Sequence, residues 1–401
     1  MLRFAPRLSS LLVCLVLAAC GGPAKGTVIP LPPGTVQPQS LPNLGDLLSG
    51  TPRPTPVPLD PALPPGNGRL FYIDRELNRG VMMVPAEGGE PQVIGRFREG
   101  ERVGLVRSWS PDHQSALISA GDSGPGSSVD AEHFYVTDAY GANPRYLGVI
   151  DAACQSVSDP VWAPDGTKAI VAVMVFAAEH TSSCDMTTPS GKALYLLDLK
   201  ALAVRKLAED PDIYTYSMET KIAWSPDSST IAYATGEVGH DELPDELRTL
   251  RLADPRPETR LRDIEISRVF WPAPGEVLLE ASCDGSPLTH LCVFDPASGA
   301  VEPAFRTEDD AALIFDSLSP DGTWLLAREL RRDLLLLINR RTGAAETIPD
   351  SADLYTRMVV WSPNGRYLAI PGAGGRSYAY EIGSGRPVFP LISAEVWAWL
   401  P

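Results

Sequence analysis

The six cysteines are the residues of this chain with the most versatile side-chain chemistry. Four of them lie outside the apolar N-terminal segment, at Cys154, Cys184, Cys283 and Cys292. Thiolates bind zinc, but zinc sites usually contain a closely spaced Cys-x-x-Cys pair, which this sequence lacks. An even number of cysteines in an exported chain favours disulfides instead. We therefore expect two disulfides, Cys154–Cys184 and Cys283–Cys292, provided that the chain is exported.

Catalytic and metal-binding motifs are weakly supported. Gly121-Asp122-Ser123-Gly124 resembles the nucleophile segment of trypsin-like proteases, but it lies in a polar loop and no motif supplies its base. The five histidines are scattered and do not occupy equivalent positions of the repeat described below. Carboxylates cluster in residues 209–212 and 237–246, where calcium binding is an alternative to a solvated charge run, although EF-hand spacing is absent. We therefore expect no cofactor, with calcium as the alternative.

The N-terminal segment is typical of an exported lipoprotein. Arg3 and Arg7 precede an apolar run, Leu8 to Ala19, that is too short to span a bilayer as a helix. The overlapping Leu17-Ala18-Ala19-Cys20-Gly21 resembles a bacterial lipobox, which implies a signal peptide over 1–19 and a lipidated Cys20. Residues 20–68 are rich in proline and nearly uncharged, which predicts an extended linker. We expect a chain anchored by lipid to the cell membrane or outer membrane, facing the periplasm or exterior.

The net charge of −16 limits the partners that the chain can bind. Affinity for nucleic acid comes largely from lysine and arginine side chains that neutralise phosphates, so a nucleic-acid partner is not expected. The same charge disfavours contact between the folded body and anionic lipid. Contact with the membrane is therefore expected only through the N-terminal lipid.

One motif recurs through residues 69–401 and determines the expected fold. Tryptophan or leucine is followed by Ser/Ala-Pro-Asp/Asn, usually by glycine, and then by an alternating apolar run. Proline presets φ for a tight turn, and glycine takes the left-handed position that closes it. A second pair of strands follows each copy. The copies are Ser108–Asp112, Val161–Gly166, Ala223–Asp227, Ser317–Gly322 and Val360–Gly365, with a degenerate copy at Phe270–Gly275.

Four strands per repeat, at spacings of roughly 40 to 60 residues, are typical of β-propeller blades. Six complete repeats follow three strands, near residues 69–73, 81–84 and 92–94, that lack a first strand. Ala398-Trp399-Leu400-Pro401 aligns with Ala223-Trp224-Ser225-Pro226 and supplies that strand. We therefore expect an all-β, seven-bladed propeller over 69–401, closed by a C-terminal strand that completes blade 1, after a disordered proline-rich stalk. Six blades are the alternative, if the degenerate repeat merges with a neighbour.

The Trp-Ser-Pro-Asp-Gly repeats resemble those of TolB-like propellers, a family of bacterial envelope proteins and propeller-bearing peptidases. The resemblance covers about residues 69–401 and implies a fold rather than a function, because the motif lies in structural turns. TolB itself has six blades and an additional N-terminal α/β domain, which a lipid anchor and linker replace here, so its partners are not transferred. Peptidase activity is not expected, because the chain has no room for a hydrolase domain.

The propeller geometry supports both disulfides. Cys154 would lie in the loop that enters blade 3, and Cys184 in the long loop between the second and third strands of the same blade. Both loops emerge on one face. Cys283 and Cys292 flank a short connection in blade 5 and could join adjacent strands.

A charged residue precedes the motif tryptophan, or its equivalent, by two to four positions in each blade. Because innermost strands face the propeller axis, these residues predict a ring of mixed charge that forms a binding face, together with tyrosines of the same loops. Simple hydration of the strand ends is the alternative. The residues are Arg107, Asp159, Lys221, Arg268, Asp316, Arg357 and Glu395, with Tyr214, Tyr216 and Tyr355.

Two classes of function remain. The first is a non-catalytic binding or scaffold module of the cell envelope that engages a protein, peptide or glycan. The second is a small-molecule or metal-dependent enzyme that uses the central channel, such as a polysaccharide-processing propeller. The absence of a converging set of acid, base, nucleophile or metal ligands favours the first. We expect the propeller to be monomeric.

Overall fold

The structure is a computed structural model of the chain. The chain divides into two compact units, residues 1–40 and 41–401, and the described residues all belong to the second. Among them, no helix has the length and apolar character that crossing a membrane requires. The described residues are 63–64, 66–74, 80–96, 105–121, 131–139, 143–151, 154–180, 183–213, 221–236, 246–283, 290–305, 313–355, 359–394 and 396–401.

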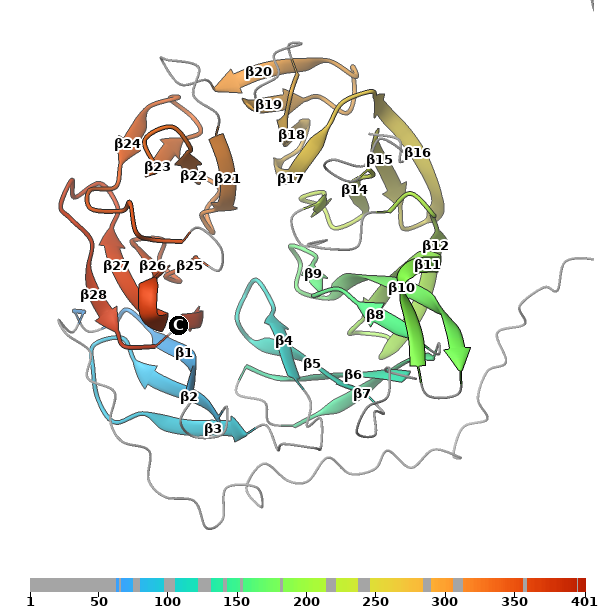
Figure 1. Ribbon diagram of the computed structural model, residues 1–401, viewed down its shortest axis with the longest axis horizontal. Helices are drawn as coiled ribbons and strands as arrows, with labels where there is room; N and C mark the ends of the chain where they lie inside the picture. The colour runs from blue at the N-terminus through green and yellow to red at the C-terminus, as the bar shows by residue number, and fades with distance from the viewer. Residues whose placement is uncertain are drawn as a thin grey trace, which may run out of the picture. The chain divides into compact units, whose positions relative to one another are not determined.

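The described part of the chain forms seven antiparallel sheets, each of which is one blade (Figure 1). Six of them are four-stranded, and in the third the innermost strand is split in two. The prediction of an all-β, seven-bladed propeller is confirmed, and the six-bladed alternative is wrong because the degenerate repeat forms a sheet of its own.

The strands of each blade run from the innermost to the outermost position. Blade 1 comprises β29 (Val396–Leu400), β1 (Arg69–Asp74), β2 (Gly80–Pro85) and β3 (Gln92–Arg96). Blade 2 comprises β4 (Leu105–Trp109), β5 (Ser115–Gly121), β6 (Ala131–Asp138) and β7 (Arg145–Asp151). Blade 3 comprises β8 (Gln155–Val157), β9 (Val161–Trp162), β10 (Lys168–His180), β11 (Ser183–Asp198) and β12 (Ala203–Glu209). Blade 4 comprises β13 (Ile222–Trp224), β14 (Thr230–Ala234), β15 (Glu246–Arg251) and β16 (Asp254–Arg262).

The remaining blades follow the same order. Blade 5 comprises β17 (Ile266–Ala273), β18 (Glu276–Ala281), β19 (His290–Phe294) and β20 (Val301–Phe305). Blade 6 comprises β21 (Leu313–Leu318), β22 (Trp324–Glu329), β23 (Leu334–Asn339) and β24 (Ala345–Thr347). Blade 7 comprises β25 (Val360–Trp361), β26 (Tyr367–Gly372), the short 3₁₀ turn η1 (Ala373–Gly375), β27 (Arg376–Glu381) and β28 (Phe389–Ile392).

The C-terminal strand closes the ring. β29 pairs antiparallel with β1, with Arg69 opposite Leu400 and Leu70 opposite Trp399. The first blade is thus built from both ends of the repeat region, as the alignment of Trp399 with the motif tryptophans predicts. Pairing the last strand in this way leaves no open seam between blades 7 and 1.

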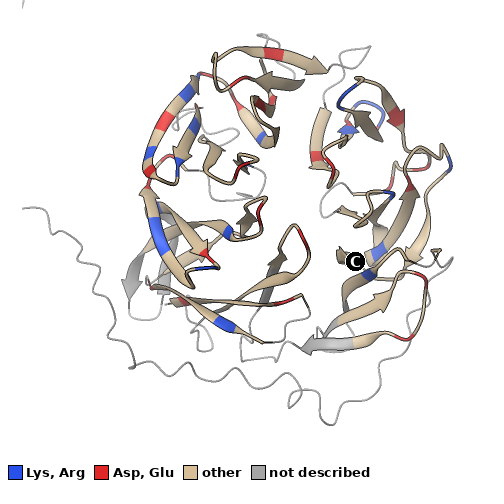
Figure 2. Cartoon of the chain, turned by 180° about the vertical axis from the view of Figure 1, so that it is seen from behind, with Lys and Arg blue, Asp and Glu red and all other residues tan. Residues whose placement is uncertain are grey.

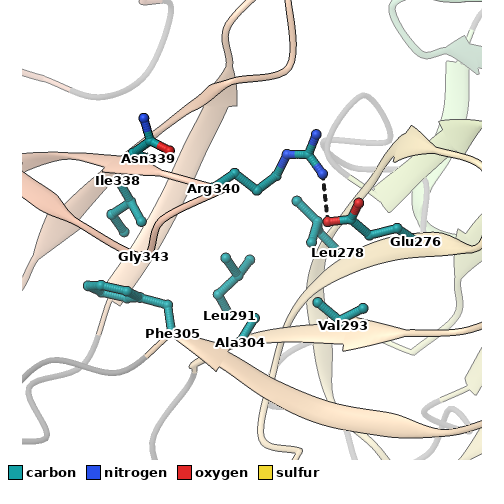
Figure 3. A pocket seen from close by; sticks show the side chains of 10 residues that line it. All are labelled: Glu276, Leu278, Leu291, Val293, Ala304, Phe305, Ile338, Asn339, Arg340 and Gly343. Carbon is teal, nitrogen blue, oxygen red and sulfur yellow. Dashed lines mark ion pairs between the residues drawn. The ribbon is translucent and has the colours of Figure 1, made fainter.

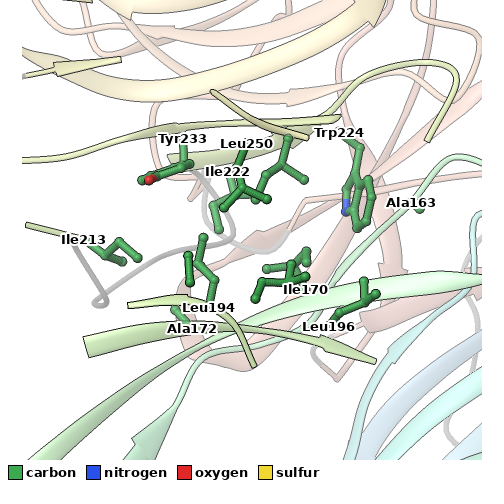
Figure 4. Packing of buried hydrophobic residues seen from close by; sticks show 13 residues of the cluster. Ala163, Ile170, Ala172, Leu194, Leu196, Ile213, Ile222, Trp224, Tyr233 and Leu250 are labelled. Carbon is green, nitrogen blue, oxygen red and sulfur yellow. The ribbon is translucent and has the colours of Figure 1, made fainter. Parts of the chain in front are cut away.

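The core consists of apolar layers between neighbouring blades. In the layer between blades 3 and 4, Ile170 and Leu194 face Trp224 and Tyr233, and all four side chains are buried (Figure 4). A comparable layer joins each successive pair of blades, and the last one packs Tyr367 of blade 7 against Trp399 of blade 1. Each blade therefore buries apolar surface on both sides, and this burial stabilises the ring as one unit.

The motif serine is a structural residue of the turn. Ser110 is 1% exposed, and its hydroxyl donates to Asp112 Oδ1 over 2.5 Å while it accepts the Ser115 amide over 3.0 Å. The hydrogen bond from Ser110 holds the pKa of Asp112 below its usual value. The equivalent pair recurs in blades 4, 6 and 7, as Ser225–Asp227, Ser319–Asp321 and Ser362–Asn364.

The two faces of the ring carry different connections. We call the face with the motif turns the turn face, and the opposite face, which holds the connections between the second and third strands and those between blades, the loop face. The outermost strands form the rim, where β16 carries alternating charge along its edge (Figure 2). Ion pairs Arg256–Asp254 and Arg260–Glu258 lie on this strand, over 3.2 and 2.7 Å. Charge on an exposed strand discourages edge-to-edge pairing with another sheet.

Blade 3 departs from the expectation. Residues up to His180 and from Ser183 belong to two long paired strands, β10 and β11, so the prediction of a long loop that contains Cys184 is wrong. Cross-strand pairing includes Ala178 opposite Cys184 and continues to His180 opposite Ser183. The apolar run Ile170–Ala178 supplies enough strand-forming residues to extend the hairpin beyond the sheet.

Candidate functional site

The pairing of the innermost strand with the second strand is irregular before the motif residue in every blade. In blades 1, 2 and 6 one residue is left out of the pairing with the second strand, and it lies two positions before the motif tryptophan or its leucine equivalent. In blade 5 the unpaired residue is Ser267, and in blade 3 residues 158–160 lie opposite only two residues of β10. A bulge redirects the extra side chain out of the alternation of the strand and is common beside functional sites. We call Arg107, Asp159, Ser267, Asp316 and Trp397 the axial ring.

Trp397 is the bulged residue of blade 1. It lies between Val396, paired with Tyr72, and Ala398, paired with Phe71. Trp397 is 37% exposed, whereas Val396 and Ala398 are 1% and 7% exposed. The bulge therefore turns a large aromatic side chain out of the interface between blades and presents it to solvent.

Blades 4 and 7 carry longer insertions at this position. In blade 4, Ile213 forms a bridge with Thr235, and the regular pairing resumes only at Ile222. In blade 7, Leu354 forms a bridge with Gly372, and pairing resumes at Val360. Tyr355 lies at the start of the second insertion, and its side chain is 55% exposed.

Arg268, Glu280 and Asp316 meet at the seam between blades 5 and 6. Arg268 Nε lies 3.5 Å from Glu280 Oε2, and its Nη2 lies 3.8 Å from Asp316 Oδ1. Arg268 Nη1 also donates to the backbone carbonyl of Asp316 over 3.1 Å. Burial raises the pKa of Glu280 to about 7, although the Phe315 amide and Arg268 oppose that rise. Arg268 and Asp316, two of the charged residues singled out in the sequence, are thus brought together as an ion pair.

The prediction that Lys221 belongs to an exposed ring of charge is wrong. It is 5% exposed, and its ammonium donates to the carbonyl of Gly236 over 3.1 Å, so it does not contribute to an open surface. A buried ammonium needs such an acceptor because desolvation is costly. Asp159, by contrast, is exposed between β8 and β9. The side chains of Arg107, Arg357, Glu395, Tyr214 and Tyr216 lie outside the described residues.

The acidic residues before and within blade 4 surround an arginine. Arg248 contacts Asp210 over 2.6 Å, Asp212 over 2.8 Å and Glu246 over 2.7 Å. Although burial alone would raise the pKa of Glu246, hydrogen bonds from Arg248 and Thr259 hold it below its usual value. Arg248 therefore forms ion pairs with three carboxylates and reduces the repulsion between them. Among the described residues no group of three or more potential ligands is placed to hold a metal, and residues 237–245 lie outside them.

Two cavities lie away from the axial ring. The crevice in Figure 3 has a volume of about 40 Å³ and lies between blades 5 and 6. Its walls are apolar, and Arg340 and Glu276 form an ion pair over 2.6 Å at its side (Figure 3). A second cavity of about 250 Å³ lies at the turn face beside His113, Asp138 and Leu400. Both are below the usual volume of roughly 300–1,000 Å³ for a small-molecule site.

The cysteines are disulfide-bonded where the structure describes them. Cys283, just after β18, is bonded to Cys292 of β19. Cys154 is also disulfide-bonded, and the side chain of Cys184 lies outside the described residues. This disulfide joins neighbouring strands of blade 5, and both of its cysteines pack in the apolar layer between blades 4 and 5.

Two members of this region were not singled out in the sequence. Glu280 is one acidic residue inside an apolar strand, Val277-Leu278-Leu279-Glu280-Ala281, and this isolation was an available signal. Trp397 stands beside the motif tryptophan Trp399, and the sequence gives no sign that only Trp399 points into the core. A register shift separates their roles.

Comparison with known proteins finds likeness only at the level of structure. No family model matches the chain, and no curated protein matches it. TolB from Acinetobacter baumannii superposes with a TM-score of 0.47 at 15% identity, over 83% of this chain and 67% of that chain. Oligogalacturonate lyase from Vibrio parahaemolyticus gives a TM-score of 0.54 at 11% identity, over 85% of this chain and 91% of that chain.

A puromycin-hydrolyzing peptidase from Mycobacterium tuberculosis is also similar in structure. It gives a TM-score of 0.53 at 14% identity, over 84% of this chain and 53% of that chain. This chain therefore spans about half the length of that peptidase. At such identities the likenesses to the lyase and the peptidase support the fold alone.

Proposed function

We propose that the chain is a membrane-anchored β-propeller of the cell envelope that acts as a non-catalytic binding module for a protein, peptide or glycan. The repeated bulge of the innermost strands carries the proposal. The bulge exposes Trp397, and the corresponding irregularity in blade 3 contains the exposed Asp159. The motif residues around them form turns or pack between blades. Exposed aromatic side chains on a rigid scaffold are typical anchors of binding surfaces.

The lipid anchor and the location in the cell envelope are part of the proposal. Their support is the lipobox-like Leu17-Ala18-Ala19-Cys20-Gly21 followed by a proline-rich linker. Within the propeller, the chain reaches blade 1 from the turn face, where Leu63 packs in the layer between blades 7 and 1 and its amide donates to Ala86. The loop face is therefore free of this segment where it is described.

Site-specific photo-cross-linking in intact cells tests the proposal. A photoreactive side chain at position 397 or 355 should yield defined adducts with one partner, identified by mass spectrometry. Leu202 is the matched control, since it is 39% exposed but lies on the turn face between β11 and β12. Adducts at position 202 in equal yield, or none at 397 and 355, would count against the axial ring as the binding surface.

A second candidate is an enzyme that acts on envelope polysaccharides. The observation in its favour is Glu280, because a carboxyl group with a pKa of about 7 is suited to general acid–base catalysis. Against it, Glu280 is 4% exposed and already accepts the Phe315 amide. Turnover of purified polysaccharide by the wild-type chain, lost in Glu280→Gln, would favour the enzyme over the binding module.

A further inference from the structure

Glu280 of blade 5 reaches across to the innermost strand of blade 6. Its Oε2 accepts the backbone amide of Phe315 over 2.8 Å. Phe315 immediately precedes Asp316, the bulged residue of β21. Within blade 5, Glu280 is paired in register with Arg268, whose Nη1 donates to the Asp316 carbonyl. Two residues of blade 5 thus hold the backbone on both sides of the bulge in blade 6.

Among the described side chains, Glu280 faces one guanidinium and one other carboxylate. These charged groups are Arg268 from β17 and Asp316 from β21, while β19 places Leu291 opposite Glu280. Arg268 contacts both carboxylates, and its Nε lies 3.5 Å from Glu280 Oε2. A buried carboxylate with so few donors is costly to ionise.

Glu246 in blade 4 shows the contrasting arrangement. It is also nearly buried, at 3% exposed, but it contacts Arg248 and Arg262, each over 2.7 Å, and Thr259 over 3.0 Å. These donors hold its pKa below the usual value, whereas burial raises the pKa of Glu280 to about 7. Glu246 has more donors and also lies nearer the surface than Glu280, and both differences favour its ionised form.

We propose that Glu280 is a proton-binding positioning residue that makes the hold of blade 5 on the Asp316 bulge, and so the geometry of the axial ring, dependent on pH. When the Glu280 carboxylate takes up a proton it becomes neutral, and the ion pair between Arg268 and Asp316 remains. When that proton is lost, a second negative charge is buried at the seam, and local opening of the seam is favoured. The consequence for binding rests on the proposed function, whereas the titration is a property of the ligand-free chain.

Thermal unfolding of the full chain and of Glu280→Gln between about pH 5 and about pH 8.5 tests the proton binding. The folded pKa lies above the unfolded value of 4.5, so the stability contributed by this group is present at low pH and is lost as pH rises through about 7. The melting temperature of the wild type should therefore fall relative to that of Glu280→Gln as pH rises from about 5, and the difference should level off above about pH 7. Parallel curves for the two proteins would overturn the proposal.

Glu246→Gln is the matched control. Its carboxylate is stabilised in the folded state, so the variant should be less stable than the wild type throughout this range and should show no added step near neutral pH. A decline over the same pH range in the difference between wild type and Glu246→Gln would assign the titration to another group and overturn the role of Glu280.

Hydrogen exchange of the wild type alone tests the positioning role and does not require a variant to fold. Exchange of the segment Leu313–Leu318, corrected for the intrinsic pH dependence, should become several-fold faster as pH rises from about 5 to about 7. Unchanged protection would show that Glu280 does not control the bulge. If protection changes with pH but binding of the cross-linked partner does not depend on Trp397, the role of Glu280 is supported and the proposed function is wrong. If protection does not change but binding depends on Trp397, the proposed function is supported and the role of Glu280 is wrong.

Discussion

The indole Nε1 of Trp361 in blade 7 donates to the hydroxyl of Ser317 in blade 6 over 3.0 Å. The same relationship joins blades 3 and 2, where Trp162 Nε1 donates to Ser108 Oγ over 2.7 Å. In both cases the acceptor belongs to the residue just before the motif tryptophan, or its leucine equivalent, of the preceding blade. The motif tryptophan therefore fills the space between sheets and also links consecutive blades by a directed hydrogen bond.

Blade 5 lacks this link, and a single substitution should supply it. Trp271 Nε1 is buried and has no hydrogen-bond partner in the described structure, and the equivalent acceptor position in blade 4 is Ala223, which packs in the same apolar cluster. Ala223→Ser places a hydroxyl where Ser108 and Ser317 have theirs, and it should raise the free energy of unfolding by about 1 kcal/mol. Thermal or denaturant unfolding measures the change.

Ala232→Ser is the control for that experiment. Ala232 is fully buried in the same cluster and pairs with Ala223 across the strands, but it does not occupy the acceptor position. Its hydroxyl should lower the free energy of unfolding by about 1 kcal/mol, because a polar group is buried without an assigned partner. Equal effects of the two serines would mean that the blade-to-blade hydrogen bond is not the cause.

His113 occupies a position that favours glycine. Its φ is 56°, and the equivalent residues of blades 3, 6 and 7 are Gly166, Gly322 and Gly365, with φ between 65° and 67°. His113→Gly should stabilise the chain by up to about 1 kcal/mol, because a side chain is strained in this region. Ser228, at the same position in blade 4, accepts the Asp165 amide over 3.1 Å, so Ser228→Gly should give no such gain.

The gain from His113→Gly should also depend on pH. Burial lowers the pKa of His113 below 6.5, although Asp112 opposes this shift. A depressed histidine pKa means that the neutral form is favoured in the folded state, so its stability is lost as pH falls. The melting-temperature difference between variant and wild type should therefore grow as pH falls through the unfolded pKa of 6.5. A difference that shrinks with acidification would contradict the assignment.

The closing strand should be indispensable for stability. Trp399 is 1% exposed, stacks on Tyr367 and donates through Nε1 to the carbonyl of Asn67. Trp399→Ala should lower the free energy of unfolding by about 3–5 kcal/mol. Truncation after Ser393, which removes the whole of β29, should abolish cooperative unfolding, as followed by circular dichroism.

Trp397→Ala provides the comparison on the same strand. Because Trp397 is bulged and 37% exposed, its loss should change the melting temperature little. Equal destabilisation by the two tryptophan substitutions would show that the bulge assignment is wrong. Full stability of the chain truncated after Ser393 would show that the closure of blade 1 by β29 is wrongly assigned.

The sequence was sufficient for the fold because the information is local and repeated. Proline and aspartate determine each motif turn, and the alternating apolar run after it determines the second strand. The number of blades therefore follows from the number of copies of the motif. Closure was also readable, since Trp399 carries the motif without its following strands. Each of these features depends on residues within a few positions of one another.

The axial ring was only partly predictable because bulges depend on the register between strands. The spacing before the motif tryptophan pointed to Arg107 and Asp316, which are bulged residues, but also to Lys221, which is buried. The pKa of Glu280 depends on Phe315 and Asp316 of the neighbouring blade, a contact between distant parts of the chain. No local pattern encodes such a contact.

Binding of the cross-linked partner to purified variants tests the central claim most directly. We predict that Trp397→Ala, with its melting temperature unchanged, weakens the affinity at least about 10-fold, as expected for loss of an aromatic anchor. Leu202→Ala on the turn face should bind as the wild type does. Wild-type affinity in Trp397→Ala would contradict the account, since the axial ring would then not be the surface that binds.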